Sequence, residues 1–481
     1  MGTGGSTVMH NRRSGGASKR GRIHPVFGLA ALLLVVGCGT DSQEDVSAPT
    51  EGTITTSGAP MERVQPGQTG VVSVDSEEIG TIAVQISLPA EARYSEGAGV
   101  VVEVNTFFTA QDGFFESVDV TEIGLIHISY LWPGTTDQSG AYSDGTLDHG
   151  GEDSMLALRD VIRFAAGEIP DADGWFLADL IAITPLDVGL YAFSHPGLAA
   201  VNVLATHGDD LDVKWLLGRE NPTEDVTSAV EIGHWGSGGR PVPAPGYRYP
   251  GSYTATALHP DYTGARWDDG FTEAESRHVG RAYLDLDGDG ELSDADFVFG
   301  SRIPVMFDMR FHSVGLTRAL ADGGSLTADS WPTDLATVDE AERVWAVLSS
   351  VPRYEAVGEL NPDLMVMLVF ADRDHVQPAL DKPHIHMAFD GFSATAGLWV
   401  RLNPDRAYVE SLAAEFAALA SDNPANTEPS NWIDARSWSY GNAAGANQIV
   451  PLAAVAEMAD RAHGNVMDDD LDRPLVIYAV P

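Results

Sequence analysis

Apolar residues recur with two different periods along most of this chain. Alternating or β-branched apolar runs predict strands, and they lie at residues 81–89, 99–105, 124–130, 188–193 and 213–217. Apolar positions three and four residues apart predict helices over residues 155–165, 198–207 and 451–463. Because strands alternate with helices, we expect βαβ units and a largely parallel sheet.

This alternation lapses over residues 221–360, which are rich in Gly, Pro, Trp and Tyr, and resumes with apolar runs at 364–370 and 398–402. A segment of this length is long enough to fold as a subdomain. We therefore predict one α/β domain formed by residues 76–220 and 361–481, interrupted by an insertion.

The N-terminal segment has the pattern of an export signal. Basic residues precede an apolar run over residues 26–36 that is too short to span the ~30 Å hydrocarbon core of a membrane. The run closes with Val35-Val36-Gly37-Cys38, which resembles a lipobox, and Cys38 is the only cysteine. We expect residues 1–37 to be a lipoprotein signal peptide and Cys38 to be lipidated. The mature protein would then be membrane-anchored and extracytoplasmic, in the periplasm or on the cell surface. The alternative is a cleavable signal with an incidental cysteine.

Composition adds a tether and an acidic surface. Residues 38–75 have little apolar content and predict a flexible acidic tether. The chain has 28 Lys and Arg against 70 Asp and Glu, a formal net charge of −42. Such a surface repels nucleic acid, so we expect no nucleic-acid partner. With a single cysteine, core burial or a metal must stabilise the fold in place of an intramolecular disulfide.

Residues 285–296 have the ligand spacing of a calcium-binding loop. Oxygen-bearing side chains stand at positions 1, 3, 5, 9 and 12, glycine stands at position 6, and position 7 supplies a backbone carbonyl. The expected ligands are Asp285, Asp287, Asp289, Glu291, Ser293 and Asp296. The loop resembles EF-hand loops and, because position 12 is Asp, dockerin loops more closely. A single loop indicates structural calcium that stiffens the insertion, with a solvated acidic turn as the alternative.

A serine stands between the strand 188–193 and the helix 198–207, in the sequence Ala192-Phe193-Ser194-His195-Pro196. A strand–turn–helix of this kind is a nucleophile elbow, which exposes the hydroxyl and aims the next backbone N–H at a developing oxyanion. Proline replaces the small residue that usually closes the motif. We interpret Ser194 as a candidate nucleophile and the His195 N–H as an oxyanion donor, with a helix-capping serine as the alternative.

From this elbow, the chain resembles the α/β-hydrolase superfamily over residues 80–480. Strands, elbow, an insertion in the lid position and a later acid-bearing strand follow in the order of that superfamily. Residues 147–161 (LDHGGEDSMLALRDV) also resemble a group of exported, poorly characterised hydrolase-like proteins. The resemblance implies an α/β-hydrolase-type, mostly parallel sheet flanked by helices, with a large lid-like insertion.

The resemblance also implies positions for the catalytic acid and the second oxyanion donor. The acid belongs a few residues beyond the strand 364–370, where Asp374 matches best and Asp372 is the reserve. The second donor belongs to the loop after the third strand, at Thr106 or Phe107. That loop has no glycine-rich oxyanion motif.

The catalytic histidine departs from the superfamily's pattern. It should follow the strand 398–402, but Asn403-Pro404-Asp405 stands there without a nearby histidine. His384, at an expected helix start just after the acid loop, is the candidate that we favour. His375 and His463 remain open.

These residues leave three functions open. The first is a lipid-anchored serine hydrolase that cleaves a carboxylic ester or peptide-like bond of a small-molecule or peptide substrate, using Ser194, Asp374 and His384. The second is a catalytically inactive hydrolase-fold binding protein stabilised by calcium. The third is a zinc hydrolase whose ligands are Asp374, His375, His384 and His386. The substrate, the membrane leaflet and the oligomeric state do not follow from the sequence.

Overall fold

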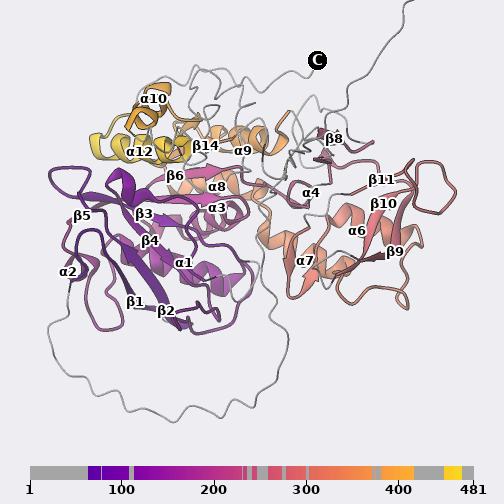
Figure 1. Cartoon of the computed structure of the whole chain (residues 1–481), viewed down its shortest axis with the longest axis horizontal. Helices are drawn as coiled ribbons and strands as arrows, with labels where there is room; N and C mark the ends of the chain where they lie inside the picture. The colour runs from indigo at the N-terminus through magenta and orange to yellow at the C-terminus, as the bar shows by residue number, and fades with distance from the viewer. Residues whose placement is uncertain are drawn as a thin grey trace, which may run out of the picture. The chain divides into compact units, whose positions relative to one another are not determined.

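The structure is a computed structural model, and its central feature is an eight-stranded sheet (Figure 1). It describes residues 63–76, 78–107, 113–229, 231–235, 241–245, 247, 258–272, 278–299, 303–370, 374, 377, 381–415 and 449–467. The strands of the sheet are β1 (Thr69–Ser76), β2 (Gly80–Ser87), β3 (Ala98–Glu103), β4 (Ile126–Tyr130), β5 (Pro185–Phe193), β6 (Val213–Arg219), β14 (Met365–Val369) and β15 (Trp399–Leu402).

The order of these strands across the sheet is β1-β2-β4-β3-β5-β6-β14-β15. Strand β2 is antiparallel to both of its neighbours, and every other pairing is parallel. This is the strand order of an α/β-hydrolase-type sheet, so the predicted fold class is confirmed. The carboxyl ends of β3, β5, β6, β14 and β15 therefore meet along one edge.

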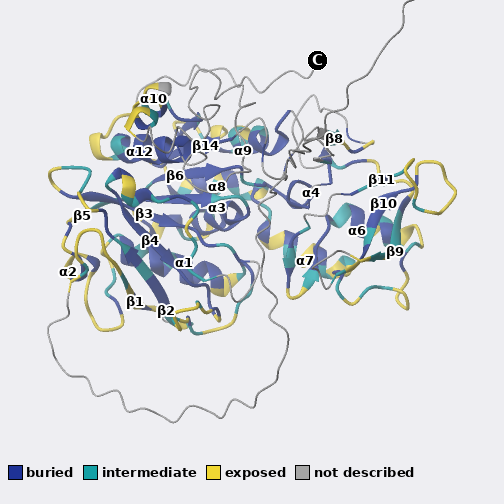
Figure 2. Cartoon of the chain, in the orientation of Figure 1, coloured by how far each residue is buried: buried dark blue, intermediate teal, exposed yellow. Residues whose placement is uncertain are grey.

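Helices cover both faces of the sheet. One face packs against α1 (Glu152–Ala165), α3 (Pro196–His207), α8 (Tyr354–Leu360) and α9 (Pro383–Ser393). The other packs against η1 (Val120–Ile123), α10 (Arg406–Glu415) and α12 (Ile449–Gly464). Successive residues of a strand point to opposite faces, so both sides of the central strands are buried (Figure 2). This explains why those strands form continuous apolar runs in the sequence.

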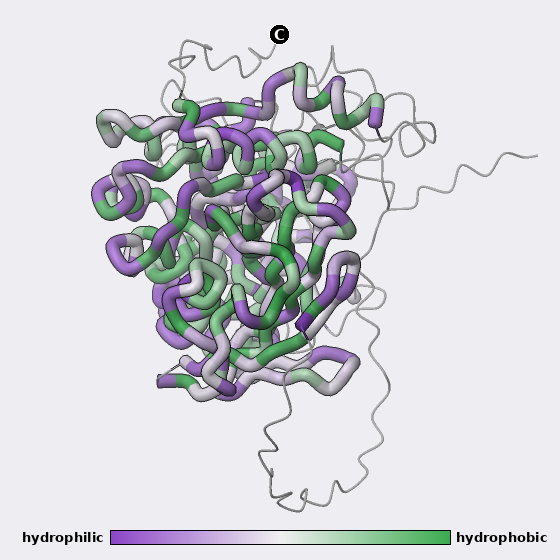
Figure 3. Tube along the Cα trace, turned by 90° about the vertical axis from the view of Figure 1, so that its left-hand side faces the viewer, coloured by the Kyte–Doolittle hydropathy of each residue, from purple (hydrophilic) through white to green (hydrophobic). Residues whose placement is uncertain are grey.

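The predicted strands and helices of the main domain are confirmed to within a few residues of their ends. Hydrophobic stretches gather in the interior of the trace and hydrophilic stretches in its outer turns (Figure 3). None of the helices among the described residues has the length and apolar character needed to cross a bilayer.

The expected tether over residues 38–75 is wrong at its C-terminal end. Residues from Thr69 onward form β1, which pairs with β2 along its whole length. Only alternate positions of β1 are buried, among them Val72 and Val74, and the intervening polar residues gave the segment the composition of a linker. Cys38 and the expected signal peptide lie outside the described residues.

The insertion after β6 contains short elements of its own. They are α4 (Asp225–Ser228), β7 (Gly233–Trp235), β8 (Pro241–Pro243), β9 (Ala265–Thr272), β10 (Val279–Leu284), β11 (Phe297–Val298), β12 (Val305–Met306), β13 (Met309–Arg310), α6 (Val314–Asp322), α7 (Val338–Leu348) and η3 (Val351–Arg353). The smaller elements α2 (Leu177–Leu180) and η2 (Gly208–Asp210) lie before it. Residues between Val226 and Leu335 form a separate hydrophobic cluster, whereas Trp345 of α7 and Val357 of α8 pack into the core of the main sheet.

A buried polar network crosses four adjacent strands, from the start of β4 to the carboxyl ends of β3, β5 and β6. His127 Nε2 on β4 lies 3.0 Å from Glu103 Oε2 on β3. The other Glu103 oxygen accepts from the N–H and the hydroxyl of Ser117, and the Ser117 hydroxyl oxygen lies 3.3 Å from the Tyr191 hydroxyl on β5. Arg219 at the end of β6 donates to the Tyr191 hydroxyl, at 3.2 Å. Burial alone would lower the pKa of His127, but the hydrogen bond and charge of Glu103 outweigh it and raise that pKa.

We predict that this pair makes stability depend on pH. Because the pKa of His127 is higher in the folded state than the unfolded value of about 6.5, its contribution is complete below pH 6.5 and is lost as the pH rises through the folded pKa. His127→Gln should therefore remove part of the fall in unfolding free energy above pH 6.5, measured by urea denaturation at several pH values. Glu103→Gln should cost about 3–5 kcal/mol at pH 6, because it leaves a buried partner uncompensated.

His463→Gln is the matched control, since His463 is only partly buried and stacks on Tyr94. An unchanged pH slope in His127→Gln would contradict the assignment.

Candidate functional site

Ser194 forms the turn between β5 and α3 with a positive φ of 65°. Its N–H donates to Arg219 O at 2.9 Å, which ties the turn to the end of β6, and its carbonyl accepts from Gly197 N at 3.0 Å. A left-handed conformation at a non-glycine residue costs about 1–2 kcal/mol. Strain of this kind persists only where the surroundings fix it, and it is the geometry of a nucleophile elbow.

The side chain of Asn221 fixes this turn through hydrogen bonds to three backbone carbonyls. Its Nδ2 donates to the carbonyls of Ser194 at 2.7 Å, Ala192 at 3.0 Å and Arg219 at 3.2 Å. A Cβ on Gly197 would lie 2.1 Å from Asn221 Cγ, so no larger residue fits at position 197. The glycine that permits close approach thus stands one position later than in the usual motif, which explains how Pro196 is accommodated at the first turn of α3.

The oxyanion candidates lie on two loops at this edge. His195 is buried and begins α3 with helical φ and ψ, and the first N–H groups of a helix have no acceptor within it. Phe107 follows β3, which is the neighbour of β5 in the sheet. Thr106 precedes it in the same loop. His195 and the loop after β3 therefore lie at the same edge of the sheet as Ser194.

His149 holds the Phe107 loop, and sequence reasoning missed it. Its Nδ1 lies 2.6 Å from Phe107 O, and Phe307 N donates to its Nε2 at 3.2 Å. A carbonyl can only accept and a backbone N–H can only donate, so the proton is on Nδ1. One imidazole therefore joins the loop after β3 to the β12–β13 hairpin of the insertion. The sequence signal was the run DHGG before α1, in which His149 has φ 54°.

Asp374 and His384 form a pair. His384 Nε2 lies 3.0 Å from Asp374 Oδ2, and both side chains are fully buried. Asp374 Oδ1 accepts from Gln377 N at 2.8 Å. The pair follows β14, two strands away from β5 along the same edge. His384 Nδ1 is buried and makes no hydrogen bond, so it does not bond the Ser194 hydroxyl in this conformation.

The position where the superfamily places its histidine is occupied by Asn403. Asn403 follows β15 with φ 56°, donates its N–H to Leu368 O at 2.9 Å and accepts from Phe370 N at 3.0 Å through Oδ1. It therefore joins the ends of β14 and β15. His463 stacks on Tyr94, which precedes β3, so it lies at the amino ends of the parallel strands and away from Ser194.

The zinc set gains no support from the described residues. His375 and the reserve acid Asp372 lie outside them. Burial and the neighbouring His384 lower the pKa of His386 to about 4. Among the described residues, only Asp285, Asp287 and Asp289 form a cluster of His, Cys or carboxylate ligands with metal-binding geometry.

A second acid, Glu220, reaches the same edge. It follows β6 directly, is buried, has φ 49° and donates its N–H to Val369 O at 2.9 Å. Its place beside the end of β5 makes it a further candidate acid. The only signal for it in the sequence is a carboxylate directly after an apolar strand.

The acidic loop 285–296 connects two paired strands. β10 and β11 pair through Leu284 and Phe297, which brings the two ends of the loop together. The flanking elements are therefore strands and not the helices of an EF-hand, which corrects that part of the resemblance. Carboxylate oxygens of Asp285, Asp287 and Asp289 lie within 4.8 Å of one another.

Several hydrogen bonds hold the loop closed. Asp296 Oδ1 accepts from Leu286 N at 2.8 Å, and its Oδ2 accepts from the N–H and hydroxyl of Ser293. Glu291 donates its N–H to Asp289. Asp285 lies 2.6 Å from Arg266 Nε on β9. Although desolvation opposes it, the bonds from Arg266 and two backbone N–H groups lower the pKa of Asp285. The loop thus presents oxygen ligands of the kind that calcium prefers.

Comparisons with known proteins agree in fold only. No family model matches the chain, and no curated protein matches it. Among solved structures, an α/β serine hydrolase without a lid from Xanthomonas campestris has 16% identity and a TM-score of 0.23, covering 34% of this chain and 65% of its own. The esterase domain of a Rhodothermus marinus protein has 11% identity and a TM-score of 0.27, covering 70% and 86%. Prolyl oligopeptidase B from Galerina marginata has 10% identity and a TM-score of 0.38, covering 82% and 37%.

The chain thus spans less than two thirds of the length of the first and the third of these proteins. At such identities and TM-scores, the assignment of an α/β-hydrolase-type fold rests on the strand order of the sheet.

We predict that the strain at Ser194 is measurable. Ser194→Gly should have an unfolding free energy about 1 kcal/mol higher than Ser194→Ala, because glycine adopts a positive φ without the Cβ clash. Chemical denaturation of the two variants measures the difference. At the control position Ala205, inside α3, Ala205→Gly should instead lower stability by about 1 kcal/mol. Equal stability of the two Ser194 variants would show that the turn is unstrained.

Proposed function

We propose that this protein is a serine hydrolase that cleaves a carboxylic ester or peptide-like bond, anchored by lipid at Cys38 outside the cytoplasm. The observation that carries the proposal is the left-handed Ser194 at the end of β5, on the same sheet edge as the buried Asp374–His384 pair. The anchor and the location are inferred from the N-terminal sequence pattern alone.

The route of proton transfer follows from the hydrogen bond that Asp374 already makes with His384. Asp374 binds His384 Nε2, so Nδ1 is the nitrogen that takes the proton of Ser194 as its oxygen attacks the carbonyl carbon. The oxyanion accepts from the His195 N–H and from an N–H of the Phe107 loop. Hydrogen bonds of this kind are often long in free enzymes and shorten in the complex with substrate. Substrate binding therefore has to bring the buried Nδ1 and the hydroxyl together.

A second function is favoured by a specific observation. Asn403 occupies the usual histidine position, and His384 is completely buried with Nδ1 unbonded. A protein that had lost catalysis would keep the elbow as a structural turn and use the same edge for binding. Under this second function, the protein is a hydrolase-fold binding protein stabilised by calcium.

A fluorophosphonate probe separates the two functions. The purified protein with calcium should be labelled, Ser194→Ala should abolish labelling, and His384→Gln and Asp374→Asn should slow it about a hundredfold or more. Ser139→Ala, at an exposed serine in a turn, is the control and should label normally. Absence of labelling in the folded wild type would leave the binding protein as the function.

We also propose that the loop 285–296 binds one structural calcium ion through Asp285, Asp287, Asp289, Glu291, Ser293 and Asp296. What supports this is the closeness of three carboxylates and the pairing of β10 with β11 at the ends of the loop. Bound calcium would supply the positive charge that Arg266 now provides to Asp285. Its role is to stiffen the insertion.

Calcium at a hundred times its dissociation constant should add about 2.7 kcal/mol to the unfolding free energy, and EGTA should remove this gain. Asp287→Asn should lose most of the response, whereas Asp269→Asn, at an exposed acid on β9, should keep it. Arg266→Gln should bind calcium more tightly, because no guanidinium then competes for Asp285. Identical thermal unfolding with calcium and with EGTA would remove the proposal.

A further inference from the structure

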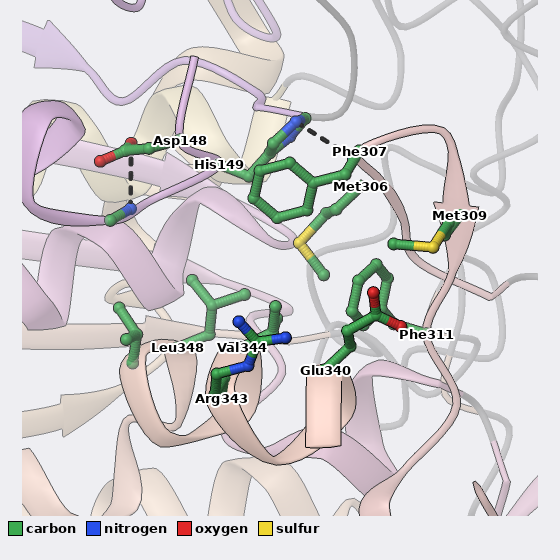
Figure 4. Close-up of a pocket in the computed structure, with 12 residues that line it drawn as sticks. Asp148, His149, Met306, Phe307, Met309, Phe311, Glu340, Arg343, Val344 and Leu348 are labelled. Atoms are coloured by element: carbon green, nitrogen blue, oxygen red, sulfur yellow. Dashed lines mark hydrogen bonds between the residues drawn. The ribbon is translucent and has the colours of Figure 1, made fainter. Parts of the chain in front are cut away.

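A cavity of about 350 Å³ lies between the loop before α1, the β12–β13 hairpin and α7 (Figure 4). Small-molecule sites in proteins have volumes of about 300–1,000 Å³. Most of the walls are apolar: the hairpin and the residue after it contribute Met306, Phe307, Met309 and Phe311, and α7 contributes Val344, Val347 and Leu348. Methionine side chains are flexible and polarizable, so they adapt to a flexible aliphatic ligand.

The hairpin that forms one wall is strained. Phe307 and Asp308 form its two-residue turn with φ of 51° and 64°, between the paired residues Met306 and Met309. Such turns normally contain Asn-Gly or Asp-Gly, and a bulky residue with a positive φ is rare. Phe307 is held there by its bond to His149 Nε2 and by its ring, whose centroid lies 4.4 Å from that of His149. Phe307 as a whole residue is nevertheless 49% exposed, and it lines the cavity, so it is available to contact a ligand.

The two carboxylates that line the cavity already accept hydrogen bonds from groups of the protein itself. Asp148 accepts from the N–H groups of Gly151, Asp153 and Ser154 at the start of α1. Glu340 accepts from the N–H and hydroxyl of Thr337 in the capping box of α7, and these bonds lower its pKa. Each carboxylate therefore offsets the partial positive charge of a helix N-terminus. Arg343 of α7 also lines the cavity, and its Nε donates to the carbonyl of Asp339. Two carboxylates and one guanidinium leave the lining without a net positive charge, and together with the net charge of −42 on the chain this favours an uncharged ligand over an anion.

We propose that this cavity binds the uncharged aliphatic chain of the substrate, an acyl chain of about eight carbons. The volume sets the upper limit on this length, because at about 30 Å³ per water-sized group the cavity of about 350 Å³ has room for about twelve such groups. His149, whose ring forms part of the wall, is hydrogen bonded to Phe107 O, so the cavity is directly connected to the loop that would supply the second oxyanion donor. The assignment of this aliphatic chain to a hydrolysed substrate rests on the proposed hydrolase function.

Binding can be measured without turnover in the Ser194→Ala protein. Calorimetric titration with methyl butanoate, methyl hexanoate and methyl octanoate should show affinity rising about fourfold for each added methylene. Methyl 8-hydroxyoctanoate should bind about tenfold more weakly than methyl octanoate, because its hydroxyl would be buried among apolar side chains. An affinity that does not depend on chain length would overturn the proposal.

Two variants place the ligand in this cavity. Val347→Trp should fill the space and reduce octanoate-ester binding at least tenfold, whereas Val279→Trp, at a similarly exposed valine on β10, should leave it unchanged. Phe307→Gly relieves the positive φ, so the protein stays folded, and it should weaken binding about threefold to tenfold by removing one wall. If folded Val347→Trp and Phe307→Gly proteins bind as tightly as their parent, the cavity is not the site.

The two proposals fail in distinguishable ways. Chain-length-dependent binding that depends on Val347, combined with no fluorophosphonate labelling of wild type, would keep the cavity as an aliphatic-chain site and remove its assignment to a hydrolysed substrate. Labelling of Ser194 without any binding of the octanoate ester would keep the hydrolase and overturn the aliphatic-chain site.

Discussion

The architecture of the site depends on how adjacent parallel strands end at one edge of the sheet. Strands β5, β6 and β15 are each followed by a non-glycine residue with a positive φ: Ser194, Glu220 and Asn403. Each of these residues donates its backbone N–H to a carbonyl near the end of a neighbouring strand: Arg219, Val369 and Leu368, respectively. A left-handed residue costs about 1–2 kcal/mol, and the three hydrogen bonds offset part of that cost. The three strands therefore end in line with one another, and the residues that follow them lie along a common edge of the sheet.

A buried polar network next to that edge contains charged side chains and also fixes the position of the turn at Ser194. Arg219 lies over the Phe193 ring, 4.4 Å from its centroid, and donates to the Tyr191 hydroxyl. The same residue supplies the carbonyl that accepts from Ser194 N. Through Tyr191 and Ser117, it is linked to the buried Glu103–His127 pair. The serine turn is therefore fixed both by backbone bonds and by a side chain that belongs to a satisfied buried network, which is the condition under which such networks add rigidity.

The sequence was informative where a feature is local in the chain. Apolar runs identified β2 to β6, β14 and β15, and strand–Ser–helix spacing located the elbow. The Asp374–His384 pair was also accessible, because His384 stands only ten positions after the acid, in the first turn of an expected helix. Contacts between distant segments left no such signal. Asn221 binds three carbonyls from two strands, and His149 joins two loops 200 positions apart in the sequence (Phe107 to Phe307). The sequence did not predict strand β1, because half of its residues face solvent and most of these are polar.

The position of His384 on α9, and not after β15, has a structural consequence of its own. A histidine after β15 would stand on a loop at the open edge, where one ring nitrogen can face substrate. His384 instead lies in the first turn of α9, buried against the sheet, and uses Nε2 for Asp374. Placing acid and base on one short segment keeps the pair together during any movement of that segment. In the proposed hydrolase, proton transfer from Ser194 then requires α9 or the elbow to shift, so the rate of the reaction would depend on that movement as well as on the pair itself.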